Sequence, residues 1–120
     1  MHPKSPKWLH DILEACEVIQ SATRGQTLAD YEGDRLLRSA VERNFEIIGE
    51  ALNRIDRTDP ATAGRIPEHA AIISFRNLLI HGYDYVEHSR VWKIIEADVP
   101  RLKGQVEQLL KGAESGEPKP

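Results

Sequence analysis

The hydrophobic residues of this chain recur at spacings of three and four positions along three long stretches, residues 5–24, 34–55 and 87–110. An α-helix makes one turn in about 3.6 residues, so this spacing places the apolar side chains on one side of a helix. Each stretch therefore predicts a helix with an apolar stripe that packs against the rest of the molecule. Pro100 should bend or restart the last of these helices.

A fourth helix is predicted to open at Pro67 and to end near His81. Apolar residues cover most of its circumference, so we expect this helix to be largely buried. Gly82 is the natural left-handed residue after a helix end, and a histidine in the last turn suits the negative end of the helix dipole. Residues 58–66 contain a cap and a proline but leave room only for a short helix.

Gly49 lies within the second predicted helix, where a glycine costs about 1 kcal/mol relative to alanine. A close approach by another backbone is one explanation, and simple tolerance of the glycine is the other. Charged residues alternate in sign on the other faces of this helix, which is typical of a solvated helix surface.

The composition agrees with an all-α fold. A charged fraction of 29% and an aromatic fraction of 6% favour helices over sheets, because long unbranched side chains lose little freedom in a helix. Four main helices in 120 residues fit one antiparallel bundle of four to five helices. We assign residues 1–112 to this domain, and residues 113–120, which carry no large apolar side chain, to a flexible tail.

Three further features restrict the function. Cys16 lies among apolar residues, which favours a place in the core over a reactive role. The net charge of −3 argues against broad nucleic-acid binding, so any nucleic-acid chemistry should use a local site. No window approaches the roughly 18 apolar residues of a membrane span, and residues 1–5 lack an apolar signal core, so we expect a cytoplasmic protein.

The polar residues that need an explanation lie in residues 74–83, where Arg76 and Asn77 interrupt the most apolar predicted helix. A charge that becomes buried needs a partner. Asn77 and His81 share one face of the helix, whereas Arg76 lies about 140° from His81 around the axis. Their functional groups meet only if the helix end or a second subunit helps.

A purely structural interpretation of these residues is also open. Arg76 would pair with an acid such as Glu46 or Glu50, His81 would cap the helix end, and Tyr83 would pack in the following turn. A metal site is disfavoured, because no two histidines have the i, i+4 spacing of a helical zinc site and the sole cysteine is distant in sequence. We therefore expect no cofactor.

The pattern Arg76-x4-His81-x-Tyr83, with Asn77 directly after the arginine, closely resembles the signature of the HepT-type toxins of the HEPN superfamily. The second and last predicted helices also match this family, at residues 40–43, 47–51, 91–92 and 98–102. The resemblance covers roughly residues 8–110, and the set of spaced motifs is far more specific than a lone Arg-x4-His pattern.

This resemblance implies a homodimeric helical bundle that acts as the ribonuclease toxin of a toxin–antitoxin module. Two chains would pair antiparallel and form one composite cleft. His81 would act as general base or acid, Arg76 would clamp the scissile phosphate, and Asn77 would orient the phosphate or the histidine. A cognate minimal nucleotidyltransferase, the antitoxin, would neutralise the RNase by transferring AMP to Tyr83.

Two other functions stay open. The chain could be a non-catalytic HEPN subunit that binds a nucleotide or regulates a partner nucleotidyltransferase, or a plain helical dimerisation module. The intact set of four motif residues favours the enzyme, and a dimerisation module gives no purpose to the Arg-Asn pair. Tyr85 is the nearest competitor of Tyr83 for modification, and Tyr83 could also serve packing alone.

Overall fold

A computed structural model describes residues 1–114, except for the side chains of Tyr83 and Glu114. Four long helices make up most of this part of the chain: α1 (Ser5–Thr23), α3 (Arg35–Thr58), α5 (His69–His81) and α6 (His88–Glu114). Two short helices and one 3-10 turn connect them: α2 (Leu28–Gly33), α4 (Pro60–Ala63) and η1 (Tyr83–Tyr85). The described residues contain no strand, so the predicted all-α class is confirmed.

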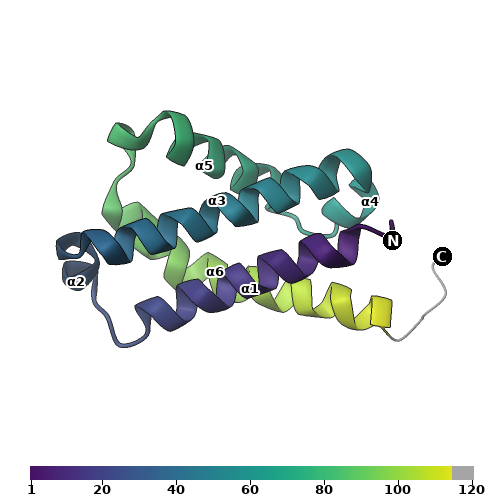
Figure 1. Ribbon diagram of the computed structural model, residues 1–120, viewed down its shortest axis with the longest axis horizontal. Coiled ribbons are helices and arrows are strands. Elements are labelled where there is room, and N and C mark those ends of the chain that lie inside the picture. Colours follow the sequence, from purple (N-terminus) through teal and green to yellow (C-terminus); the bar gives the residue numbers. More distant parts are fainter. Residues whose placement is uncertain (115–120) are drawn as a thin grey trace.

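Helix α3 lies at the centre of the fold, with α1 on one side and α5 on the other, while α6 packs against α1 (Figure 1). Neighbouring long helices run in opposite directions, as the sequence colours of Figure 1 show. Helix α5 makes most of its helix contacts with α3. The result is the predicted antiparallel bundle, in which α5 is the least covered of the long helices.

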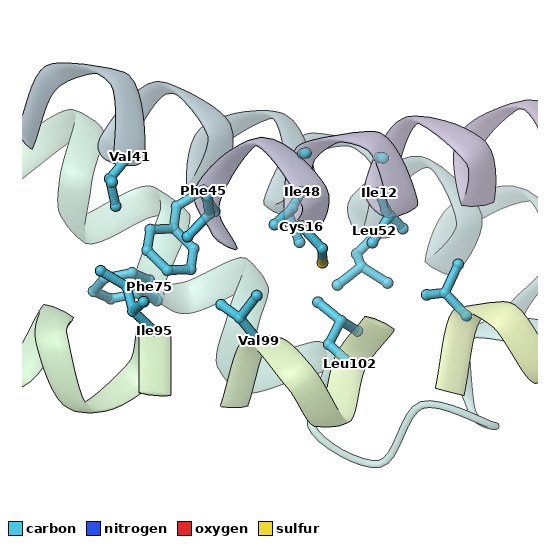
Figure 2. Close-up of a cluster of buried hydrophobic side chains, with 14 of the residues drawn as sticks. Ile12, Cys16, Val41, Phe45, Ile48, Leu52, Phe75, Ile95, Val99 and Leu102 are labelled. Atoms are coloured by element: carbon cyan, nitrogen blue, oxygen red, sulfur yellow. The ribbon is translucent and has the colours of Figure 1, made fainter. Parts of the chain in front are cut away.

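The core lies between α1, α3 and α6, and α5 contributes to it from one side. Figure 2 shows part of this cluster, with the labelled side chains Ile12, Cys16, Val41, Phe45, Ile48, Leu52, Phe75, Ile95, Val99 and Leu102. The side chain of Cys16 is completely buried here, and burial raises the pKa of its thiol to about 12. A thiol with such a pKa stays protonated at neutral pH, so the predicted core role of Cys16 is confirmed.

Polar caps start two of the helices. The carboxylate of Asp34 accepts a hydrogen bond from the backbone N–H of Leu37 at 3.0 Å and caps α3. Helix α2 begins with a capping box, in which Thr27 and Asp30 each accept a hydrogen bond from the other's backbone. The hydrophobic pattern did not predict α2, because its one buried side chain is Tyr31 and a single residue makes no stripe.

The prediction that the fourth helix is largely buried is wrong. Only Phe75 and Leu79 of α5 are buried, and Ile80 is 42% exposed. The reason is that α5 packs on α3 along one face, which leaves the other apolar side chains partly open to solvent. The helix also begins at His69, two residues after Pro67.

Helix α6 differs from the prediction in two respects. It continues through Pro100 and does not restart there. Pro100 lies on the exposed side, where water can hydrate the carbonyl group of Glu96 that loses its N–H partner. The helix also reaches Glu114, two residues past the expected domain boundary, while residues 115–120 of the expected tail lie outside the described residues.

None of the helices in residues 1–114 combines the length and the apolarity that crossing a membrane requires.

Candidate functional site

The packing of α5 on α3 places Arg76 directly over Gly49. A methyl group built on Gly49 would lie 2.2 Å from Cβ and 2.6 Å from Cγ of Arg76. A close approach therefore exists at this glycine, but it is made by the base of the Arg76 side chain on α5 and not by another backbone, as was expected. Because the contact lies within one chain, Gly49 does not itself require a second subunit.

Two other contacts fix how α5 lies along α3. Near its start, Nε2 of His69 lies 3.3 Å from Oδ1 of Asp56. In its middle, the rings of Phe75 and Phe45 meet edge to face with centroids 5.4 Å apart. These contacts and the Gly49 crossing hold the region around Arg76 in a defined register with α3.

The guanidinium of Arg76 is held by its neighbour in sequence. Its Nη1 donates a hydrogen bond to Oδ1 of Asn77 at 3.0 Å. Its Nε is buried and has no hydrogen-bond partner within residues 1–114. The structure thus brings two of the predicted site residues together and leaves the outer edge of the guanidinium for another group.

The structural interpretation that paired Arg76 with an acid on α3 is wrong for both candidate acids. Glu50 pairs with Arg54 at 2.9 Å, and Glu46 lies 3.5 Å from Arg43. Arg76 forms no ion pair with any described residue. The half-buried Arg76 is therefore a charge without an acidic partner among the described residues.

His81 is the last residue of α5, and its side chain is exposed, as is that of Asn77. The ring of His81 makes no hydrogen bond to another described residue, so it does not cap the helix. Neither the side chain of Arg76 nor that of Asn77 forms a hydrogen bond with this ring. The structure therefore agrees with the expected separation of Arg76 and His81 around the helix.

Gly82 ends the helix in a different way from the one expected. Its φ is −127°, so it does not adopt the left-handed conformation. Its N–H donates to the carbonyl oxygen of Leu78 at 2.7 Å, and a methyl group on Gly82 would lie 2.8 Å from Cδ1 of Leu78. The 2.8 Å neighbour is the end of a flexible side chain that can move, so neither a positive φ nor a rigid contact requires glycine at this position.

The turn η1 follows Gly82 at once. Tyr83 opens it, but the side chain of Tyr83 lies outside the described residues, so its role stays a prediction. The N–H of Tyr85 donates to the carbonyl oxygen of Gly82 at 2.9 Å, which ties the turn to the end of α5. The side chain of Tyr85 is 85% exposed. Both tyrosines are thus attached to the helix that carries Arg76 and His81.

Glu42 is a half-buried acid on α3, where the alternating charges had predicted a solvated surface. Its Oε2 is buried and has no hydrogen-bond partner in the described part of the chain. Burial raises the pKa of Glu42, Arg38 opposes this shift, and Glu46 adds to it. The sequence contained a sign of this burial, because Glu42 lies two helical turns before Gly49. The two residues therefore share the side of α3 that meets α5.

A groove of about 380 Å³ lies between α5 and α6, with α3 at its floor. Apolar side chains such as Phe45, Ile72 and Ile94 line it, and an ion pair between Glu68 and Arg101 at 2.8 Å lies at its edge. No motif residue lines this groove. Within the described chain, no group of three or more His, Cys, Asp or Glu side chains is placed to hold a metal ion.

The family of this chain follows from its similarity to known proteins. The model of the family described as ribonuclease HepT-like matches residues 12–109, which is most of the sequence. This chain belongs to the ribonuclease HepT-like family. The family predicted from the Arg-x4-His-x-Tyr motif is therefore confirmed, and the motif lies within the matched segment.

Three relatives resemble this HepT-like chain over nearly their whole length. A protein of Thermococcus cleftensis, named probable ribonuclease HepT, is 38% identical over 87% of this chain and 94% of its own length. A candidate RNase of Methanocaldococcus jannaschii is 33% identical over 83% of this chain and 91% of its own. A candidate RNase of Caldanaerobacter subterraneus is 31% identical over 90% and 96%. No solved structure matches the chain.

Proposed function

We propose that this chain is an endoribonuclease that cleaves RNA with its own side chains and needs no metal ion. Membership of the HepT-like ribonuclease family supports RNA as the substrate. The observation that carries the proposal is the guanidinium of Arg76, which forms no ion pair with any described residue and donates one hydrogen bond, to Asn77. A permanent positive charge of this kind, on the same helix as the exposed His81, is suited to bind a phosphate.

The chemistry follows from these groups. The 2′-oxygen of RNA attacks the neighbouring phosphorus, and the bond from phosphorus to the 5′-oxygen breaks, which leaves a 2′,3′-cyclic phosphate and a 5′-hydroxyl. One group must take the 2′-hydroxyl proton, and another must protonate the leaving oxygen. A histidine such as His81 suits both roles, and Arg76 stabilises the added negative charge of the transition state. Asn77 holds the guanidinium in place.

The complete active site belongs to a homodimer in this proposal. Two proton transfers need two groups, and each chain supplies one motif histidine, His81. The side chains of Asn77 and His81 are also exposed, and neither lines the groove between α5 and α6. An antiparallel pair of chains would close a cleft over this surface and bring two copies of Arg76 and His81 to one phosphate.

The chain further acts as a toxin whose activity is controlled at Tyr83, in the cytoplasm. A cognate minimal nucleotidyltransferase, the antitoxin, would activate the phenol oxygen of Tyr83 to attack the α-phosphorus of ATP, releasing pyrophosphate. The new phosphodiester adds negative charge two residues beyond His81. It would compete with RNA for Arg76 and occupy the space of the RNA backbone.

The nuclease proposal is tested by assaying wild type, His81→Ala and Arg76→Ala on an RNA oligonucleotide in the presence of EDTA. Wild type should cleave, and each variant should be slower by at least about 10²-fold, the usual scale for losing a proton-transfer group or a transition-state contact. His10→Ala, which removes an exposed histidine of α1, is the matched control and should keep the wild-type rate. Full activity in either motif variant contradicts the proposal.

A further inference from the structure

Gly49 differs from the other helical glycines of the described chain in what surrounds it. It is buried in the middle of α3, and its missing side chain would point at the base of Arg76, with Cβ at 2.2 Å, Cγ at 2.6 Å and Cδ at 3.4 Å. Gly104, in the interior of α6, is exposed and would meet nothing within 4 Å. Among the described helical glycines, Gly49 is thus the one whose space is filled by a site residue, and Gly104 is an open one inside a long helix.

The contact at Gly49 cannot be relieved by a change of rotamer. Carbon atoms that are not bonded to each other pack about 3.5–4.0 Å apart, so any side chain on Gly49 would have to move Arg76 away. The Cβ atom of Arg76 is fixed by the backbone of α5. The whole helix segment would have to shift by more than about 1 Å, carrying Arg76 and Asn77 with it.

No polar anchor competes with this contact in setting the place of the guanidinium. Arg76 forms no ion pair within residues 1–114, and its Nε has no hydrogen-bond partner there. Its one hydrogen bond goes to Asn77, which lies on the same helix and moves with it. The stem of Arg76 on the bare backbone of Gly49 is thus what relates the guanidinium to α3.

We propose that Gly49 is a positioning residue for RNA cleavage: the absence of its side chain sets the distance between α3 and α5 at which the Arg76 guanidinium meets the scissile phosphate. This inference rests on the proposed nuclease function. Under this inference, the glycine that weakens the helix propensity of α3 at position 49 is there for the geometry of the site and not for the stability of the fold. Gly49 touches neither RNA nor a reacting atom, so it acts through Arg76 alone.

The experiment compares Gly49→Ala with its matched control Gly104→Ala, both measured in single-turnover cleavage of an RNA oligonucleotide. Gly49→Ala should lower the rate constant by about 10²-fold, the scale of a misplacement of about 1 Å in an active site. Gly104→Ala should stay within about two-fold of wild type, as expected for an open and independent position. A Gly49→Ala protein that is folded by circular dichroism and fully active overturns the inference.

A double-mutant cycle separates positioning from general damage. In an Arg76→Gly background the overlapping Cβ and Cγ atoms are gone, so Gly49→Ala should change the residual rate by no more than about two-fold. An equal loss in both backgrounds would mean that Gly49 does not act through Arg76 and overturns the inference. If Gly49→Ala alone does not fold, the Gly49→Ala, Arg76→Gly double variant should fold again. A double variant that also fails to fold overturns the inference.

The wild-type assay keeps the two proposals apart. An active wild type with an equally active Gly49→Ala contradicts only the positioning role, whereas an inactive wild type contradicts the nuclease function. In the second case the cycle is repeated with the affinity for a 2′-O-methyl oligoribonucleotide, which has no 2′-hydroxyl to react. Each of Gly49→Ala and Arg76→Gly should then weaken binding, and the double variant should lose less affinity than the sum of the two single losses. A loss equal to that sum rejects the inference.

Discussion

The carboxylate of Asp59 connects the start of the chain with the end of α3. It accepts hydrogen bonds from the backbone N–H of His2 at 2.9 Å, from the hydroxyl of Ser5 at 2.8 Å and from the hydroxyl of Thr62 at 2.6 Å. Burial alone would raise the pKa of Asp59, but these hydrogen bonds outweigh it and hold the pKa below its ordinary value. A carboxyl group whose pKa is lowered by folding stabilises the folded state when it is ionised.

Replacing Asp59 by alanine should therefore lower the free energy of unfolding at pH 7 by about 1–3 kcal/mol, since several donors lose a charged acceptor. The contribution of Asp59 is present above its unfolded pKa and is lost as the pH falls through the lowered pKa of the folded state. Urea unfolding at neutral and acid pH should show the difference between wild type and variant shrinking in acid. Asp11→Ala, which removes only the exposed pair with Lys7, is the control and should cost about 0.5 kcal/mol.

At the same scale, the sequence could identify the unusual residues but not their neighbours. Gly49 was visible as a glycine inside a helix, and Arg76 as a charge inside an apolar one. Which group would fill the space at Gly49 depends on how two helices cross. Likewise the candidate acids Glu46 and Glu50 pair within α3, because an i+3 or i+4 neighbour on the same helix is closer than the next helix.

At the scale of elements, the existence of the four long helices was predictable from the sequence, and so was a short helix near α4, but α2 was not predicted. The patterns of α1, α3 and α6 gave their positions, since each buries a long row of apolar side chains. Helix α2 has one buried residue and is marked only by its capping box. The extent to which α5 is covered could not be predicted from its composition, because that depends on how many helices pack around it.

The turn η1, which directly follows α5, contains two tyrosines. Tyr83 and Tyr85 are separated by one residue, and the backbone of Tyr85 is tied to Gly82. A transferase that binds the open end of α5 would meet the backbone of this turn and the exposed phenol of Tyr85. The proposed modification therefore depends on position within the turn and not on exposure alone.

Incubation with the cognate nucleotidyltransferase, ATP and magnesium should place AMP on Tyr83 and silence RNA cleavage. Peptide mass spectrometry would locate the adduct. Tyr83→Phe should remain active and unmodified under the same conditions, because it lacks the oxygen that attacks the α-phosphorus. Tyr85→Phe is the matched control and should be modified and silenced like wild type. Adducts on Tyr85 with none on Tyr83 would contradict the assignment.

At the scale of the whole molecule, α5 is covered by α3 on one side only and carries the motif at its open end. Ile80, next to His81, is 42% exposed. In the proposed dimer, Ile80 would be covered by the second chain. The count of motif histidines favours such a chain, and Ile80 is the exposed apolar residue next to His81 that can test it.

The surface at Ile80 predicts a dimer that one charge can disrupt. Wild type should sediment as a dimer at micromolar concentration, and Ile80→Asp should sediment as a monomer that does not cleave RNA, because a buried unpaired carboxylate is costly. Val18→Asp is the matched control, since Val18 is 41% exposed on α1, away from the motif, and it should remain dimeric and active. A wild-type monomer that cleaves RNA would contradict the composite site.

Mixed dimers decide whether the two chains share one cleft. His81→Ala and Arg76→Ala proteins, each expected to be at least about 10²-fold slower than wild type, are unfolded together and refolded so that their chains exchange. If each chain worked alone, no chain in the mixed dimer would own both groups and no activity would return. If both chains line one cleft, the mixed dimer keeps one copy of His81 and one of Arg76 around the same phosphate, so cleavage should rise above both parents. Refolding either parent by itself should restore nothing, and adding Ile80→Asp to both parents should abolish the gain, because it removes the contact that brings the two motifs together.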